Sequence, residues 1–129
     1  MSYVFDASAL IKAVELAPTR VAKIVKGQYT ADLAYYEIGN YIWKLYRKSV
    51  IRDLAPHIEL FSRLLAIMKV EHVGLTQDVL DLATKREVTY YDASYLWLAE
   101  QLSAHLVTED DVLCRAASKC LSVKDLITP

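Results

Sequence analysis

Short apolar runs alternate with longer amphipathic runs along this chain. The short runs predict β-strands at residues 3–5, 28–31, 70–73 and 105–108, and a last strand at 121–123. The longer runs predict helices at residues 9–16, 19–26, 33–48, 54–68, 92–102 and 110–118, with one more helix capped by Thr76. Strands without a clear two-residue alternation are typical of a parallel sheet buried on both faces. We therefore predict one domain over residues 1–129, a three-layer α/β/α fold with a mostly parallel sheet of four to five strands.

Individual residues predict several helix boundaries. Thr19 is expected to cap the second helix, and Gly27 lies at its carboxyl end. Pro56 sits early enough in its run to begin the fourth helix. Asp92 is expected to begin the helix that follows Tyr91.

Composition narrows the class of protein without identifying it. Hydrophobic residues make up 54% of the 129 residues, enough for a sizeable core, and nine Tyr and two Trp suggest a partner surface. The net charge of −1 gives no general attraction to nucleic acid, so any contact with it has to be local and metal-assisted. No uncharged apolar run approaches the ~20 residues of a membrane-spanning helix. We expect a cytoplasmic protein.

Cys114 and Cys120 form no CxxC pair. The sequence favours two separate, small core residues in a reducing compartment. A local disulfide is the alternative, and it is more credible for a protein from a hyperthermophile.

Four acidic residues are the candidates for chemistry. Asp6 directly follows the first strand, and Asp110 lies at the carboxyl end of the fourth. Asp92 begins a helix, and Glu37 is expected in the first turn of the helix after the second strand. Ligands of parallel α/β sheets bind at the carboxyl ends of the strands, so all four side chains are expected to converge there. Taken singly, each acid has the simpler interpretation of a helix cap.

Convergence of these acids would require a counter-charge. Two carboxylates about 4 Å apart repel by ~4 kcal/mol at an effective dielectric of ~20. The motifs contain no basic partner, and oxygen-only ligands favour Mg²⁺ or Mn²⁺ over zinc. Three glycines make no phosphate-binding loop, and the three histidines lack zinc spacing.

The motifs together are more specific than any one of them. The segments Val4–Leu10, Glu37–Asn40, Tyr91–Leu96 and Leu106–Asp110 resemble, in order and spacing, the four acidic motifs of the PIN-domain family. The resemblance covers nearly the whole chain, and its size is similar to that of the VapC-type toxins of prokaryotic toxin–antitoxin pairs. It implies a PIN-like fold and a Mg²⁺- or Mn²⁺-dependent endoribonuclease.

The resemblance also implies roles for individual residues. Asp6, Glu37, Asp92 and Asp110 would bind the metal and be catalytic. Ser8, Asn40 and Thr108 would orient these ligands, bound water or substrate. Glu109 and Asp111 flank Asp110, where the family often has other residues, so either could take the place of Asp110.

Partners and competing functions follow from the same residues. Lys12, Lys44 and Arg47 are candidates for contact with RNA, although charged stripes are commonly just solvated surface. The family implies a cognate antitoxin across the active-site groove and a homodimer. Two different functions would fit the same motifs: a PIN-like module that binds RNA or protein without catalysis, and a PIN nuclease of RNA processing or of DNA without an antitoxin.

Overall fold

Five short strands form one parallel sheet in the computed structural model, which describes residues 1–128. The strands are β1 (Tyr3–Phe5), β2 (Tyr29–Ala31), β3 (Lys69–Glu71), β4 (His105–Val107) and β5 (Cys120–Leu121). Their order is β3-β2-β1-β4-β5, and every neighbouring pair is parallel. The predicted parallel α/β sheet is therefore confirmed. Strands β2 and β3 extend the sheet on one side of β1, and β4 and β5 extend it on the other. Parallel sheets bind ligands at such a change in strand order.

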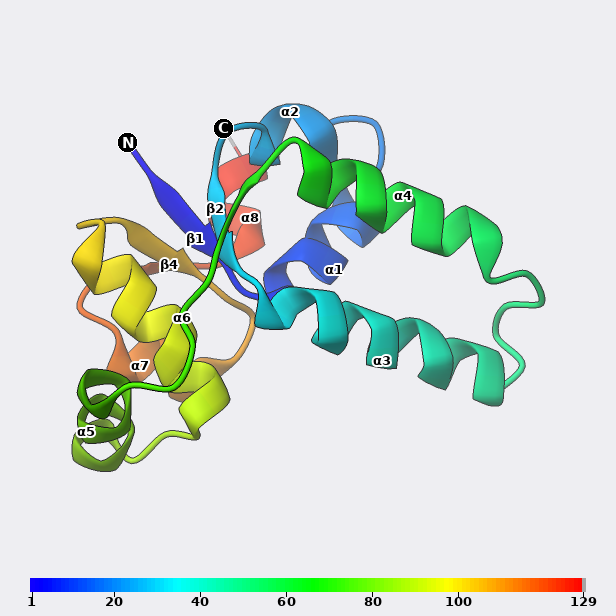
Figure 1. Cartoon of the computed structure of the whole chain (residues 1–129). Coiled ribbons are helices and arrows are strands. Elements are labelled where there is room, and N and C mark those ends of the chain that lie inside the picture. The colour runs from blue at the N-terminus through cyan, green and yellow to red at the C-terminus, as the bar shows by residue number, and fades with distance from the viewer. Residues whose placement is uncertain (129) are drawn as a thin grey trace.

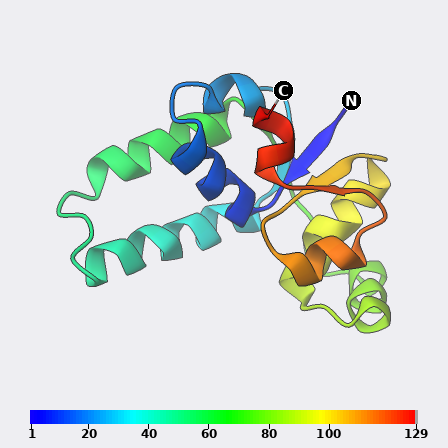
Figure 2. The ribbon, with the colours of Figure 1, turned by 180° about the vertical axis from the view of Figure 1, so that it is seen from behind.

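Eight helices surround this sheet in residues 1–128. They are α1 (Ala7–Leu16), α2 (Val21–Val25), α3 (Leu33–Arg47), α4 (Ala55–Ala66), α5 (Gln77–Arg86), α6 (Tyr90–Gln101), α7 (Asp111–Ala116) and α8 (Val123–Ile127). Helix α6 packs across β1, β2 and β4, and α5 packs against α6. Figures 1 and 2 show α1 and α8 on the opposite face of the sheet from α6, which gives the three layers that the sequence predicts.

The core lies on both faces of the two central strands. Val4 and Phe5 of β1 and Leu106 and Val107 of β4 are all fully buried. Helix α6 contributes Tyr95 and Leu96 to the same core. Burial on both faces explains why these strands read as continuous apolar runs.

Helices α3 and α4 form a hairpin that projects from one side of the molecule (Figures 1 and 2). Tyr41 of α3 and Phe61 of α4 hold the two helices together, with ring centroids 6.4 Å apart in an edge-to-face arrangement. Several large apolar side chains of the hairpin nonetheless face solvent. No helix within residues 1–128 is long and apolar enough to cross a membrane.

Several predicted boundaries differ from the structure, and three of the differences have a clear local cause. Helix α6 begins at Tyr90 because Thr89, rather than Asp92, caps it by accepting a hydrogen bond from the Asp92 amide. Helix α2 has Arg20 at its N-cap without a side-chain cap, so Thr19 does not cap it. The final strand ends at Leu121, and Ser122 with Asp125 forms a capping box that begins α8.

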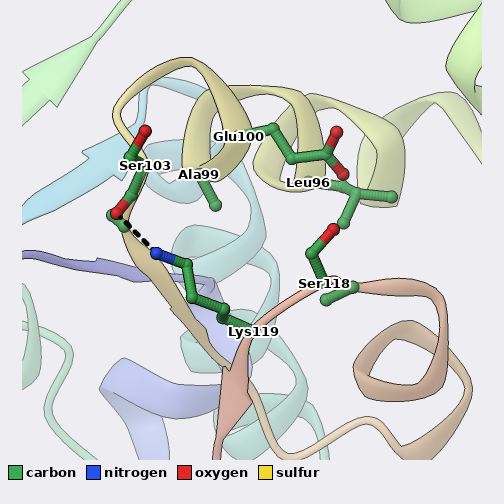
Figure 3. Close-up of a pocket in the computed structure, with 8 residues that line it drawn as sticks. Leu96, Ala99, Glu100, Ser103, Ser118 and Lys119 are labelled. Carbon is green, nitrogen blue, oxygen red and sulfur yellow. Dashed lines mark hydrogen bonds between the residues drawn. The ribbon is translucent and has the colours of Figure 1, made fainter.

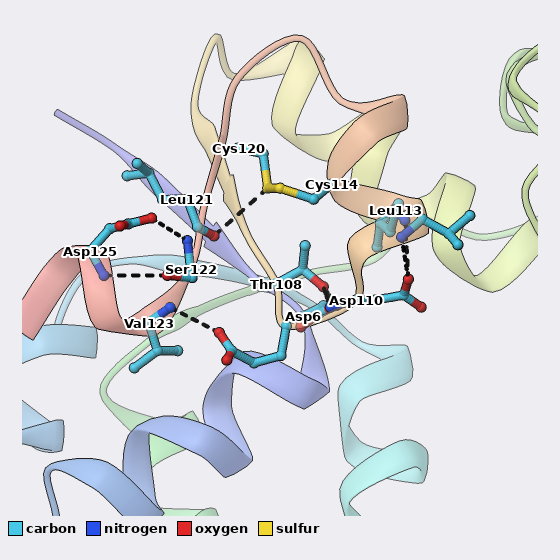
Figure 4. Close-up of a disulfide and its surroundings, with 12 residues drawn as sticks. Asp6, Thr108, Asp110, Leu113, Cys114, Cys120, Leu121, Ser122, Val123 and Asp125 are labelled. Atoms are coloured by element: carbon cyan, nitrogen blue, oxygen red, sulfur yellow. Dashed lines mark hydrogen bonds between the residues drawn. A yellow bond between two sulfur atoms is a disulfide. The ribbon is translucent and has the colours of Figure 1, made fainter.

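The favoured interpretation of the two cysteines is also wrong. Cys114 and Cys120 form a disulfide, with their Cα atoms 5.5 Å apart (Figure 4). The bond joins α7 to β5 across the turn between them. Helix α7 is short, so the chain turns back soon enough to bring Cys120 beside the helix that carries Cys114.

Candidate active site

Asp6 lies at the centre of the candidate site, at the carboxyl end of β1. Its Oδ1 accepts hydrogen bonds from the Ala9 amide at 2.9 Å, which caps α1, and from the Ser8 hydroxyl at 2.6 Å. Its Oδ2 accepts a hydrogen bond from the Thr108 hydroxyl. Only 6% of the residue is exposed. Burial raises the pKa of Asp6, the three hydrogen bonds oppose the rise, and the charge of Asp92 adds to it.

The Ser8 and Thr108 hydroxyls connect the ends of β1 and β4. The Thr108 oxygen also accepts from the Asp110 amide at 3.1 Å, and the Ser8 oxygen accepts from the Glu109 amide at 3.1 Å. The two hydroxyl oxygens lie 3.4 Å apart. This network holds Asp6 in one orientation and fixes the loop that carries Asp110.

Glu37 reaches the site from α3. Helix α3 begins at Leu33, so Glu37 lies in the second turn and not in the first, as the sequence had predicted. Its Oε1 accepts a hydrogen bond of 2.7 Å from the Tyr95 hydroxyl of α6. Partial burial raises the pKa of Glu37, the Tyr95 bond lowers it, and the charges of Asp6 and Asp92 raise it further.

Tyr95 is a member of the site that sequence reasoning missed. Its ring is buried, and its hydroxyl joins α6 to the Glu37 carboxylate. Burial, followed by the charge of Glu37, raises the pKa of Tyr95, so its hydroxyl keeps its proton and stays a donor. The available signal was its position three residues after Asp92, which places both on one side of the helix.

Asp92 lies in the first turn of α6 and is partly buried. Partial burial raises its pKa, the charge of Asp110 raises it further, and a hydrogen bond from Thr89 lowers it. Because Asp92 also raises the pKa of Asp6 and Glu37, it is electrostatically coupled to all three of the other acids.

Asp110 is the N-cap of α7. Its Oδ1 accepts from the amides of Val112, at 2.9 Å, and Leu113, at 3.1 Å. The two flanking acids lie differently. The Glu109 carboxylate accepts from the Val123 amide at 2.9 Å, at the start of α8, and Asp111 is exposed in the first turn of α7. Only Asp110 is coupled to Asp92, so we keep it as the candidate ligand.

The remaining candidates are on the surface around the acids. Asn40 is exposed on α3, three residues after Glu37. Lys44 and Arg47 are exposed further along α3, with the Arg47 guanidinium 5.9 Å from the centre of the Trp43 ring. At ~1.5 Å of rise per residue, Arg47 lies roughly 15 Å along the helix from Glu37. Lys12 is half-buried on α1 and lies 3.9 Å from Glu15.

The four acids have the donor chemistry of a Mg²⁺ or Mn²⁺ site. Within residues 1–128, none of them takes part in a salt bridge, so their negative charge has no basic partner. In the same residues, no three acidic, histidine or cysteine side chains are already gathered closely enough to hold an ion. The carboxylates therefore neighbour and repel one another without forming a ready-made coordination shell. Hard oxygen donors with uncompensated charge fit a divalent cation.

Asp6 and Asp110 also serve as helix caps, whereas Glu37 and Asp92 do not. Capping alone accounts for the positions of the first two acids but not for the others. What distinguishes this group from isolated caps is that the charges of Asp6, Asp92 and Asp110 each raise the pKa of at least one other acid in it.

A hollow of about 260 Å³ lies away from the acids, beside the ends of β4 and β5 where the chain enters them (Figure 3). Lys119 and Ser103 are among its lining residues, and the Lys119 ammonium donates to the Ser103 carbonyl at 3.0 Å. Its position at the amino ends of the strands separates it from the candidate active site.

Comparison with known proteins supplies the family. The chain is 34% identical over 119 residues to ribonuclease VapC3 of Pyrobaculum aerophilum, covering 85% of this chain and 90% of VapC3. It is 32% identical over 127 residues to exonuclease VapC9 of the same organism, covering 98% of this chain and 94% of VapC9. The chain belongs to the VapC nuclease family. The resemblance to PIN-domain VapC proteins inferred from the sequence is thereby confirmed.

The VapC assignment agrees with the fold. The crystal structure of PAE2754 from Pyrobaculum aerophilum matches this VapC chain with a TM-score of 0.86 and 31% sequence identity, over 98% of this chain and 93% of the other. No protein-family model matches the chain.

Proposed function

We propose that this VapC protein is a Mg²⁺- or Mn²⁺-dependent endoribonuclease and the toxin of a toxin–antitoxin pair. The observation that carries the proposal is Asp6, a buried carboxylate at the switch point of a parallel sheet, coupled to further acids without a basic partner. The name ribonuclease of its relative VapC3 supports RNA as the substrate.

In this mechanism Asp6, Glu37, Asp92 and Asp110 hold the metal. When bound, a divalent cation supplies Lewis-acid stabilisation of the negative charge that develops on the phosphodiester. The Ser8 and Thr108 hydroxyls hold both oxygens of Asp6, and Tyr95 holds Glu37. These bonds keep the carboxylates oriented, which limits the reorganisation needed during the reaction. Exposed Asn40 is placed to contact substrate, and Lys12, Lys44 and Arg47 would contact the RNA backbone.

Exposed aromatic side chains on the α3–α4 hairpin support the proposal of a protein partner. Tyr35, Tyr36, Trp43 and Tyr46 are each at least half exposed, whereas Tyr41 packs on Phe61. A hollow of about 170 Å³ between the helices is lined by Trp43, Ile58 and neighbouring apolar side chains. Exposed aromatic groups are enriched at protein interfaces. We assign this hairpin to contacts with a second copy and with the antitoxin, which would also cover the acids.

The name of one relative favours a second candidate for the mode of cleavage. VapC9 is named an exonuclease, and this chain covers nearly all of it. Exonucleolytic cleavage is therefore the alternative to the endonucleolytic reaction. A nuclease of RNA processing without an antitoxin and a binding module without catalysis are the two further functions that the experiments below distinguish.

The deciding experiment uses circular and linear single-stranded RNA of one sequence, with linear DNA of the same sequence. Protein freed of partner is treated with EDTA, dialysed, and assayed with Mg²⁺ or Mn²⁺. We expect cleavage of both RNAs, since a circle has no end for an exonuclease. Cleavage of the linear RNA alone would indicate an exonuclease. An inactive wild-type protein would contradict the nuclease proposal.

Matched variants assign the activity to the acids. Asp6→Asn keeps the size of the side chain and should abolish cleavage, whereas Asp53→Asn in the exposed α3–α4 loop should leave it unchanged. Circular dichroism checks that both variants fold. Wild-type turnover in Asp6→Asn would refute the site. Co-purification with the product of an adjacent small gene, and inhibition by it, would separate the toxin from a processing nuclease.

A further inference from the structure

A hollow of about 190 Å³ lies at the carboxyl ends of β2 and β3. Its lining includes Asp32, which follows β2, and His72, which follows β3. Tyr91 and Ser94 line it from the first turns of α6 and bracket Asp92 in sequence. Neighbouring strands lie ~4.8 Å apart, so a position over β2 and β3 is roughly 10 Å from one over β1 and β4. A nucleotide whose phosphate lies at the acids can span that distance with its base.

The walls of this hollow are fixed by hydrogen bonds. His72 Nδ1 lies 2.7 Å from Asp32 Oδ2. The Tyr90 hydroxyl donates to the Gly74 carbonyl at 2.6 Å and accepts from the Thr76 amide at 3.0 Å. Gly74 has a φ of +72°, and a Cβ there would lie 3.2 Å from His72 Nε2, so the wall needs glycine at this position.

The lining is suited to a flat aromatic group that carries N–H donors. The Tyr91 residue is 65% exposed, so its ring is accessible to a stacking partner. Leu33 and Val73 supply apolar surface. The Asp32 carboxylate supplies only acceptors, and one of its oxygens already faces His72. Single-stranded RNA is recognised by this combination of aromatic stacking and hydrogen bonds to base edges.

We propose that this hollow, formed by Asp32, His72, Tyr91 and their neighbours, binds a nucleobase next to the cleaved phosphodiester and selects bases with an exocyclic amine. The inference rests on the proposed ribonuclease function and adds a specificity element to it. Adenine, guanine and cytosine each present an exocyclic amine to the carboxylate. Uracil presents only its N3–H, which lies between two carbonyl oxygens that a carboxylate repels. Tyr91 stacks on the base and sets affinity, whereas Asp32 sets the preference between bases.

The test is cleavage of an RNA pool of random sequence by the full-length protein with Mn²⁺, followed by sequencing of the new ends. We expect uracil to be depleted at one position beside the cut. Asp32→Asn should remove that depletion, because an amide both donates and accepts. Tyr91→Ala should lower kcat/KM about 5- to 150-fold for all sequences, as expected for loss of base stacking.

Two controls separate this pocket from a general defect. Tyr91→Phe keeps the ring, so its kcat/KM should exceed that of Tyr91→Ala. Asp53→Asn, in the exposed α3–α4 loop and outside the lining of the hollow, should match wild type. If wild type and Tyr91→Ala cleave equally well and the new ends show no base preference, the base-binding proposal is refuted and the nuclease proposal is kept. If wild type is inactive, the proposed function fails. Binding of labelled oligonucleotides, measured by fluorescence anisotropy, would then test the hollow separately. Equal binding to wild type and to Tyr91→Ala would refute the base-binding proposal as well.

Discussion

Reduction of the Cys114–Cys120 disulfide should lower the stability of this VapC protein by an amount that its loop length predicts. The bond joins residues six apart in sequence and closes a loop of seven. Loop-closure entropy for about seven residues gives roughly 2.4 kcal/mol at 25 °C. With an unfolding entropy of about 2.1 cal/mol/K per residue, a chain of this length should lose about 9 °C in Tm.

The assay is thermal unfolding, followed by circular dichroism, of oxidised protein, of protein reduced with a phosphine, and of the double variant Cys114→Ala/Cys120→Ala. We expect the reduced protein and the variant to melt at similar temperatures, both well below the oxidised form. The phosphine should not change the variant. Turnover at 25 °C should be retained, because the capping bonds of Asp110 and the fully buried Leu113 hold the start of α7 independently. A shift below about 3 °C would refute the loop-closure reasoning.

Three further predictions concern the acids. The pKa values of Asp6, Glu37 and Asp92 are raised, so these acids bind protons more tightly in the folded chain than in the unfolded one. Their protonation therefore stabilises the fold at pH values below the unfolded pKa of ~4. This stabilisation is lost as the pH rises through the pKa values of the folded chain. Denaturant unfolding of metal-free protein should show this loss, and an equal pH slope in Asp6→Asn would contradict it. Mn²⁺ at about 100 times its Kd should stabilise wild type by about 2.7 kcal/mol, measured as a rise in Tm, and an unchanged Tm at millimolar Mn²⁺ would count against the site. Tyr95→Phe removes only the hydroxyl that holds Glu37, so Mn²⁺ affinity by calorimetry should fall about 10-fold or more with the fold intact; unchanged affinity would show that this bond has no role.

The sequence predicts the sheet well because its information is local. Short, wholly apolar runs such as Val4–Phe5 and Leu106–Val107 fit the central strands of a parallel α/β sheet, which are buried on both faces, and few other positions in such a fold. The start of α8 also has a local signal, since Ser122 and Asp125 have capping-box spacing, but the apolar Leu121 and Val123 suggested a longer strand.

The contacts that organise the site are not local and were not predictable in the same way. The Tyr95–Glu37 bond joins residues 58 apart, and Thr108 reaches Asp6 across 102 residues. A single sequence gives the candidate acids through their motifs, but it does not say which neighbouring hydroxyl holds which carboxylate. The disulfide likewise depends on how tightly the chain turns between α7 and β5.

The adjacency of β1 and β4 has a consequence for a toxin made by the ribosome. Asp6 is synthesised well before β4, one of the two strands that pair with β1, and 102 residues before the Thr108 hydroxyl that binds it. An emerging polypeptide that lacks β4 has neither this neighbour nor Asp110. On the proposed function, the cell meets an active enzyme only after β4 and Asp110 have been synthesised, which leaves time for an inhibitor already present to bind.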